Sequence, residues 1–189
     1  RAGRRTEILG WTSIPYGVVT LTERHGGVTL SESSYQDMMS DVAHHIDQFE
    51  KQHGIAGMIR QGRVQMLGTS GTVTTLAGVH FGLKRYNRRR VDGAWLSASK
   101  MIEICERLAG SDYRERVLEP CIGEERADLV VSGCAIVQAM HNTWPIRKLR
   151  VADRGVREGL LVGLMKDADR EHELAREAKA VEAKEKTVS

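Results

Sequence analysis

Gly68-Thr69-Ser70-Gly71-Thr72 joins an apolar run at 64–67 to a run of helical character at 73–79. The pattern predicts a strand, a glycine turn and the start of a helix, whose first backbone N–H groups have no partner within the helix. The helix macrodipole adds positive potential there, the glycines allow close approach, and the hydroxyls can add hydrogen bonds. The turn is therefore a candidate phosphate or nucleotide site, although many such turns are only structural and no Walker A Gly-Lys-Ser/Thr follows.

The composition is typical of a soluble globular protein. Of the 189 residues, 41% are hydrophobic and 28% charged, and no apolar run approaches the roughly 20 residues that a membrane span requires. The three cysteines, Cys105, Cys121 and Cys134, match no zinc spacing, and Cys105 and Cys134 occupy apolar positions of helical patterns. Buried thiols of this kind indicate a reducing compartment, so we expect a cytoplasmic protein without a membrane partner.

The start of the sequence and the charge of its last residues bear on what kind of chain this is. The sequence begins at Arg1 without an initiator methionine, which favours a fragment of a longer protein. Residues 167–189 hold seven acidic and five basic side chains, a net −2, so subtracting them from the +3 of the whole leaves +5 for 1–166. A charge of this size is consistent with a small polyanionic ligand and too weak to argue for DNA.

Apolar periodicity predicts one strand and one long helix before the glycine turn. The strand covers 6–14, whereas 18–21 fits either a strand or a short helix. The helix covers 35–53, with Ser34 at its cap and Gly54 as its stop. Its inward face is expected to hold Met38, Val42, Ile46 and Phe49.

After the glycine turn, the sequence predicts two helices at 97–109 and 126–142, a strand at 148–151 and a last helix after 153–155. The inward faces are expected to hold Met101, Ile104, Cys105 and Leu108 in the first helix, and Leu129, Gly133, Ile136, Val137 and Met140 in the second. The order of elements favours an α/β layer with helices packed on a sheet, a class that binds ligands at the carboxyl ends of strands. Both 68–72 and 153–155 are expected at such ends.

Four stretches match a known enzyme family in order and with compatible spacing. They are Ser13–Gly17 with Val18–Glu23, Gly68–Thr72 with Thr75–Ala77, Arg126–Val130 with Gly133, and Arg154–Leu161, and Tyr86 with Val91–Gly93 is a weaker fifth. From 6 to 164 the sequence resembles the exopolyphosphatase/guanosine pentaphosphate phosphohydrolase (Ppx/GppA phosphatase) family.

The resemblance implies an α/β fold: a ribonuclease-H-like lobe of the actin-like and sugar-kinase-like ATPase superfamily, with a mixed sheet flanked by helices. Residues 1–166 would form the second lobe of the catalytic module without its first strand, and 167–189 a charged tail that is helix-prone or disordered. The family's glycine-rich phosphate loop lies shortly before Thr6, and its catalytic glutamate belongs to the missing first lobe. No residue of this chain is therefore expected to be catalytic or to bind a metal.

The implied activity is release of the terminal phosphate of inorganic polyphosphate or guanosine pentaphosphate, with Mg²⁺ held outside this chain. Guanosine tetraphosphate, the missing first lobe and a second copy of the protein are further expected partners, and DNA is not. A nucleotide-binding or alarmone-binding regulatory module without hydrolysis is the alternative, and a small-molecule kinase lobe is a third reading of the same fold.

Three charged residues are candidates beyond the glycine turn. Arg126 can donate a bidentate pair to phosphate or stack on a base, or else pair with acidic neighbours at its helix start. Arg157 and Glu158 follow a glycine turn and are expected to support the cleft or the lobe itself. Thr20 stands where the family often has a cation, which removes one expected contact with phosphate.

Overall fold

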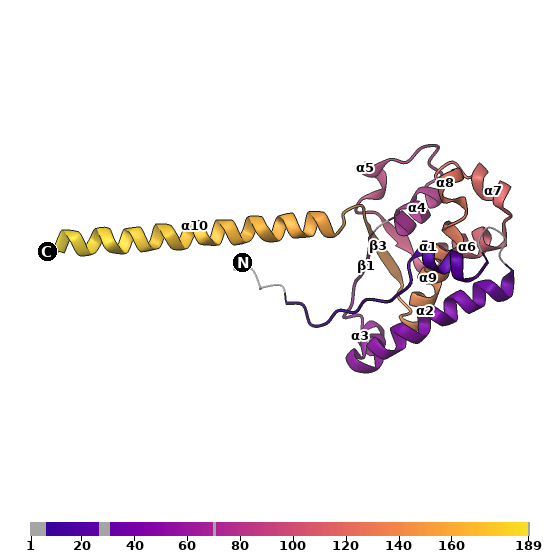
Figure 1. Cartoon of the computed structure of the whole chain (residues 1–189), viewed down its shortest axis with the longest axis horizontal. Helices are drawn as coiled ribbons and strands as arrows, with labels where there is room; N and C mark the ends of the chain where they lie inside the picture. The colour runs from indigo at the N-terminus through magenta and orange to yellow at the C-terminus, as the bar shows by residue number, and fades with distance from the viewer. Residues whose placement is uncertain (1–6, 27–30, 70, 189) are drawn as a thin grey trace. The chain divides into compact units, whose positions relative to one another are not determined.

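The computed structural model describes residues 7–26, 31–69 and 71–188, with side chains as far as 176. By its internal contacts the chain divides into two compact units, Arg1–Asp153 and Arg154–Ser189. The first unit holds all the strands of the described residues, and the second is one helix (Figure 1). The predicted division at 166 and 167 stays a prediction.

A three-stranded mixed sheet lies at the centre of the first unit. The strands are β1 (Met66–Thr69), β2 (Trp95–Ser97) and β3 (Lys148–Ala152), in the order β1-β3-β2. β1 runs parallel to β3, with Thr69 opposite Ala152, and β2 runs antiparallel to it. The carboxyl ends of β1 and β3 therefore meet at one edge of the sheet, which confirms the expected placement of 68–72 and of Asp153.

Nine helices of the described residues surround this sheet. They are α1 (Val18–Arg24), α2 (Glu32–His53), α3 (Ile55–Arg60), α4 (Gly71–His80), α5 (Arg88–Val91), α6 (Ala98–Gly110), α7 (Tyr113–Leu118), α8 (Glu124–Ala127) and α9 (Val130–Thr143). α4 contacts β1 and β3, α6 contacts β2, and α9 packs against α1, α2 and α6. The mixed sheet flanked by helices that the sequence predicts is confirmed.

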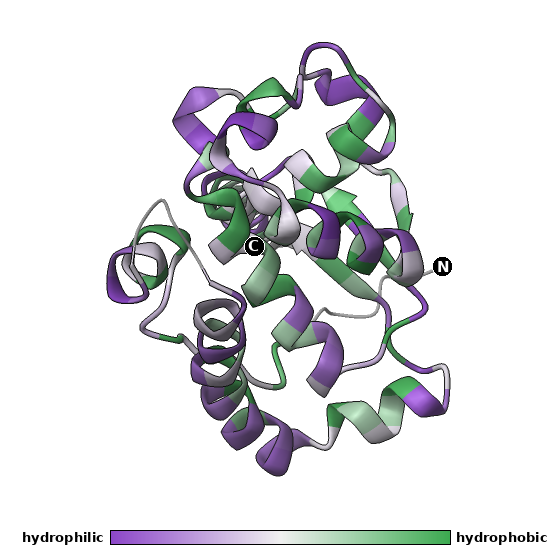
Figure 2. Cartoon of the chain, turned by 90° about the vertical axis from the view of Figure 1, so that its right-hand side faces the viewer, coloured by the Kyte–Doolittle hydropathy of each residue, from purple (hydrophilic) through white to green (hydrophobic). Residues whose placement is uncertain are grey.

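The core lies where α2, α6 and α9 meet. Met38 and Val42 of α2, Leu108 of α6 and Val131 and Cys134 of α9 are all buried, and Cys105 beside them is a free thiol. Figure 2 shows hydrophobic residues on one side of several helices and hydrophilic residues on the other, as expected of helices that bury a single face. The predicted inward residues of α6 are confirmed, with Ser97 as its N-cap.

A buried hydrogen bond joins α1 to α9. The Thr22 hydroxyl lies 2.7 Å from the Val18 carbonyl oxygen, to which it donates, and 2.6 Å from the Ser132 hydroxyl. Both residues are buried, so this bond joins α1 to α9 within the interior.

The structure decides three expectations before the glycine turn. Residues 18–21, open between strand and helix, belong to α1. The long helix begins at Glu32 rather than 35, because Ser31, whose hydroxyl accepts the Ser34 N–H at 3.1 Å, is its cap. Its stop is confirmed, since Gly54 has the left-handed φ of 63°.

The strand predicted at 6–14 is wrong over its described residues, 7–14, which form neither strand nor helix. Ile8, Leu9 and Trp11 are each 81% exposed. A strand requires a neighbour to take up its backbone hydrogen bonds, and local β propensity does not supply one.

Two corrections concern β1 and the helices after it. The strand predicted at 64–67 begins at Met66 and runs to Thr69, so two of the five residues of the predicted turn belong to the strand. The helix predicted at 126–142 is broken into α8 and α9. Strand β2 was not predicted, because its three residues are too few to show a periodic pattern.

The second unit consists of α10 (Val156–Val188). At its start the Gly155 N–H donates to a carboxylate oxygen of Glu158 at 2.8 Å, which caps the first turn. Leu160, Leu161 and Leu164 are exposed. Among the described residues, no helix combines the length and the apolar character that crossing a membrane requires.

We expect residues 1–189 to self-associate through β1, which within the described residues pairs only with β3. Leu67 is 58% exposed beside this edge, and an unpaired strand edge with an apolar side chain is prone to pair with another chain. Leu67→Lys should shift a sedimentation-velocity concentration series towards monomer. A wild-type chain that stays strictly monomeric at high concentration would contradict the expectation.

Gly68→Ala and Gly71→Ala should differ in their effect on stability. A Cβ on Gly68 would lie 2.9 Å from Val73 Cγ1 and 3.1 Å from Leu149 Cδ2, whereas nothing lies within 4 Å of a Cβ on Gly71. Because Val73 and Leu149 are buried, Gly68→Ala should lower the free energy of unfolding by about 1–3 kcal/mol. Gly71→Ala should change it by less than about 0.5 kcal/mol. Urea titrations measure both, and equal losses would show that the packing argument is wrong.

Candidate functional site

A cavity of about 610 Å³ brings together three of the four matching stretches. The start of α1 contributes Gly17 and Val18, the glycine turn and the residue after it contribute 68–69 and 71–73, and the α8–α9 region contributes Arg126 and Gly133. The remaining lining residues are Leu67, Thr75, Leu129, Val130, Ile136, Val137 and Met140. Ser70, a predicted site residue, lies outside the described residues.

One end of this cavity is polar. It lies at the carboxyl end of β1 and the first turn of α4, where Thr69, Thr72 and Thr75 supply hydroxyl groups. Arg126 lies across from them, and its Nη1 donates to the Thr75 hydroxyl at 3.3 Å. Backbone N–H groups of a helix start, hydroxyls and a guanidinium are the donors that anionic oxygens accept from.

The glycines at this end have different structural roles. Neither Gly68 nor Gly71 is among the glycines with positive φ. Val73 and Leu149 fill the space that a side chain at Gly68 would occupy, whereas the space beside Gly71 is open. Gly133 of α9 lets Thr72 approach, since a Cβ there would lie 2.6 Å from Thr72 Oγ1. Gly71 is therefore the position where the absent side chain leaves room for a ligand.

The other end of the cavity is apolar and corrects an expectation about α9. Ile136, Val137 and Met140 were expected to face the core; they pack against it but stay half-buried, and they line the cavity together with Leu129. The buried face of α9 holds smaller residues such as Cys134, Ala135 and Ala139, which let α2 and α6 pack closely. An apolar helix has no polar face to show which side turns inward, so its periodicity is a weak guide.

Arg126 depends on a second arginine that sequence reasoning missed. Arg116 is 4% exposed, and its Nε donates to the Ala127 carbonyl at 2.9 Å while Nη1 donates to the Ser111 carbonyl. Burial lowers the pKa of Arg116, and the nearby Asp128 and Asp112 carboxylates oppose that shift. The guanidinium thereby ties α8, which carries Arg126, to the end of α6. In the sequence, Arg116 stands in a charged run and looks like any surface arginine.

The acidic neighbours that could have paired with Arg126 form no ion pair with it among the described residues. No ion pair there joins Arg126 to Glu124, Glu125 or Asp128, and the Arg126 side chain is exposed. Thr20 stands where the family often has a cation. Its hydroxyl accepts the Gly17 N–H at 2.9 Å and so caps α1.

A second hollow of about 430 Å³ shares Gly71 and Arg126 with the first. Its other walls are Thr74, Tyr86 and Asp153 on one side and 120–123 on the other. Burial, followed by a hydrogen bond with the Asp153 carboxylate, raises the pKa of Tyr86 to about 12. Tyr86 thus stays a neutral phenol at physiological pH.

The other predicted site residues belong to the second unit. Arg157 and Glu158 belong to the second unit, where Glu158 caps α10, and their support of the cleft stays a prediction. Among the described residues, no group of three or more His, Cys, Asp or Glu side chains could hold a metal ion.

Proteins of known family match this chain in sequence. The model of the Ppx/GppA phosphatase family matches residues 2–168. Exopolyphosphatase 2 of Mycobacterium tuberculosis is 22% identical over 102 residues, which are 52% of this chain and 32% of that protein. The chain therefore spans about a third of the length of the curated relatives it matches.

Solved structures match the fold. A PPX-GPPA enzyme of Aquifex aeolicus aligns with a TM-score of 0.71 at 22% identity, over 83% of this chain and 50% of that one. An exopolyphosphatase of Cytophaga hutchinsonii aligns with a TM-score of 0.70 at 24% identity, over 87% and 52%. These neighbours have the actin-like ATPase fold that the sequence predicts. With the family model matching nearly all of the first unit, the chain belongs to the Ppx/GppA phosphatase family.

Proposed function

We propose that this chain is the phosphate-binding and nucleotide-binding lobe of a phosphohydrolase that releases terminal phosphate from inorganic polyphosphate, guanosine pentaphosphate or both. One observation carries the proposal: three separate family stretches meet at a single cavity whose polar end holds Arg126, three threonine hydroxyls and the start of α4. Gly68, Thr69, Ser70, Gly71, Thr72 and Arg126 are the proposed contacts.

The chemistry of phosphoanhydride hydrolysis fits such a division between lobes. Transfer of a terminal phosphoryl group to water depends on neutralising charge and orienting the water more than on a protein nucleophile. This chain supplies donors for the phosphate oxygens. A glutamate of the other lobe would orient the water, as the family resemblance implies, and Glu158 does not take that role because it caps α10.

The remaining parts of the proposal follow from the family. They are Mg²⁺ bound by residues beyond the described ones, guanosine tetraphosphate as a further ligand, a homodimer and a cytoplasmic location. A regulatory module that binds nucleotide without hydrolysing it is the second candidate. Membership of a phosphatase family supports hydrolysis over it.

Residues 1–189 alone should release no phosphate from polyphosphate or guanosine pentaphosphate when Mg²⁺ is present. The family's water-orienting glutamate and its glycine-rich phosphate loop have no counterpart in this sequence. A sensitive phosphate-release assay on the purified chain measures this. Mg²⁺-dependent turnover above the level of a denatured control would show that the assignment to the second lobe is wrong.

Arg126→Ala in the intact protein should impair hydrolysis of guanosine pentaphosphate more than that of long polyphosphate. A charged hydrogen bond contributes about 1.5–3 kcal/mol, so its loss should lower kcat/KM on the guanosine substrate by roughly tenfold to a hundredfold. Polyphosphate distributes its charge over many contacts and should lose less.

The lysine variant is the matched control for this prediction. Arg126→Lys should recover only part of the activity, because an ammonium group keeps the charge but not the planar fork of a guanidinium. Steady-state kinetics on both substrates, corrected for the folded fraction, separate a ligand contact from a structural role. Equal losses on both substrates would contradict a specific role of Arg126.

A further inference from the structure

A third hollow, of about 440 Å³, lies at the amino ends of the two parallel strands. Residues 62–65, which lead into β1, form one wall, and 146–148, where β3 begins, form another. Trp95 of β2 and Ile59 of α3 complete it. The first cavity, by contrast, lies at the carboxyl end of β1. None of the described residues that line the third hollow belongs to the five stretches that match the family.

The third hollow is positively charged. Arg63, Arg147 and Lys148 line it and are exposed, and its described lining residues include no Asp or Glu. Some other surface cations have an acidic partner, as in the Lys100–Glu103 pair. In the part of the chain that the structure describes, none of the ion pairs includes Arg63, Arg147 or Lys148. Their charge is therefore not neutralised locally, and it attracts anions.

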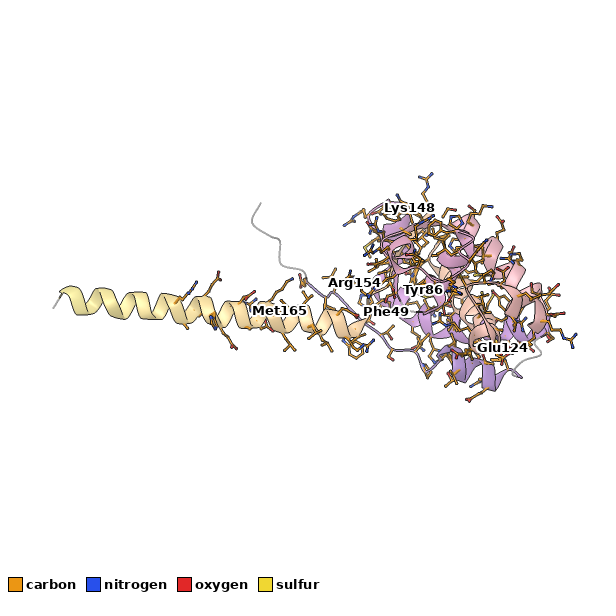
Figure 3. The ribbon with its side chains drawn as sticks, turned by 90° about the horizontal axis from the view of Figure 1, so that it is seen from above. Phe49, Tyr86, Glu124, Lys148, Arg154 and Met165 are labelled. Atoms are coloured by element: carbon orange, nitrogen blue, oxygen red, sulfur yellow. The ribbon has the colours of Figure 1, made fainter. Side chains whose placement is uncertain are left out.

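The cations are held in place by the protein itself. The Nζ of Lys148, which is labelled in Figure 3, lies 4.1 Å from the centroid of the Trp95 ring, and the Arg150 Cζ lies 5.0 Å from the same point. Cation–π attraction favours both positions. The Arg147 carbonyl accepts the Ala98 N–H at 3.0 Å, which fixes its backbone to the start of α6. A ligand thus meets cations that are already positioned, so less entropy is lost on binding.

The hydrogen-bonding groups of the hollow match a chain of phosphates. Arginine and lysine side chains only donate hydrogen bonds, and inorganic polyphosphate, with a negative charge on each phosphate, accepts them. Neighbouring phosphates can each meet a different cation. Gln65 is the single described lining side chain with an acceptor oxygen, so a base or a sugar finds one side chain to donate to. The chemistry therefore favours a bare phosphate chain.

Both phosphate-compatible sites border β1. Gln65, just before the strand, lines the third hollow, and Thr69, at its end, lines the first cavity. A strand advances about 3.3 Å per residue, so these two positions lie roughly 13 Å apart. A long polyphosphate whose end is bound in the first cavity can therefore also reach the third hollow.

We propose that the third hollow is a second binding site for inorganic polyphosphate, in which Arg63, Arg147 and Lys148 hold phosphates of the chain and Trp95 positions Lys148. The inference rests on the proposed function for the identity of the polyanion. A long chain that occupies both sites dissociates only when both contacts break, so the second site raises the affinity for long chains over short ones.

The test counts the binding sites for tripolyphosphate on the 189-residue chain by isothermal titration calorimetry at low salt. The wild type should bind two molecules per chain. Arg147→Gln combined with Lys148→Gln should weaken one site by at least about tenfold and leave the other unchanged, whereas Arg126→Ala should weaken the other. A long polyphosphate should bind the wild type more tightly than tripolyphosphate does, and the double variant should lose most of that advantage.

Two further variants serve as controls. Trp95→Leu keeps every charge but removes the ring beside Lys148, so it should weaken tripolyphosphate at the hollow by roughly two- to fivefold. An unchanged affinity would overturn the role of Trp95. Lys51→Gln removes one positive charge from α2, outside the lining of the hollow, and should leave both sites unchanged. If it weakens binding as much as Lys148→Gln alone, net charge explains the attraction and the inference fails.

The remaining outcomes separate this inference from the proposed function. A single tripolyphosphate site that Arg126→Ala weakens and the double variant leaves unchanged would overturn the inference alone. A single site that only the double variant weakens would contradict the proposed phosphate cavity and support the third hollow. Binding at neither site would overturn both. Displacement of tripolyphosphate from the hollow by polyglutamate of equal charge would show that the hollow recognises acidic peptides, and the proposed ligand would be wrong.

Discussion

The close contact between Thr72 and the bare backbone of Gly133 is the constraint on which the candidate site depends. A Cβ on Gly133 would lie 2.6 Å from Thr72 Oγ1 and 2.8 Å from Thr72 Cγ2, so any larger residue would push the first turn of α4 away from α9. Helix α9 is also tied to α1, through the buried Thr22–Ser132 bond. Three family stretches therefore converge because one helix, α9, accepts the other two at its small and hydroxyl-bearing residues.

The site has one exposed and one buried arginine with different roles. Arg126 is exposed and donates to the Thr75 hydroxyl, whereas Arg116 is buried and donates to the Ala127 carbonyl of α8 and the Ser111 carbonyl at the end of α6. Burying a guanidinium is costly unless its donors find partners, and here two backbone carbonyls accept from it. The buried cation thus stabilises the segment that carries the exposed one. At the carboxyl end of β3, an ion pair with Arg88 holds the Asp153 carboxylate, which is a hydrogen-bond acceptor.

Sequence reasoning located the elements with strong local signals. The stop of α2 at Gly54, the helix from about 97 and the strand at 148–151 were predicted, because each is signalled by a few neighbouring residues. It misplaced the boundaries of β1 and missed β2, which is too short to show a period. The strand expected at 6–14 was wrong since a strand exists only with a partner, and partners are chosen by tertiary structure.

The sequence by itself determined the family, because the order and spacing of the motifs can be read directly along the chain. It also singled out the glycine turn and Arg126. Only the tertiary structure decided which face of α9 turns to the core, that Gly68 serves packing while Gly71 leaves open space, and that Arg116 supports Arg126. It also brought Tyr86 and Asp153 to one wall. The physical reason is that burial and side-chain contact are relations between residues far apart in the chain, which local patterns do not encode.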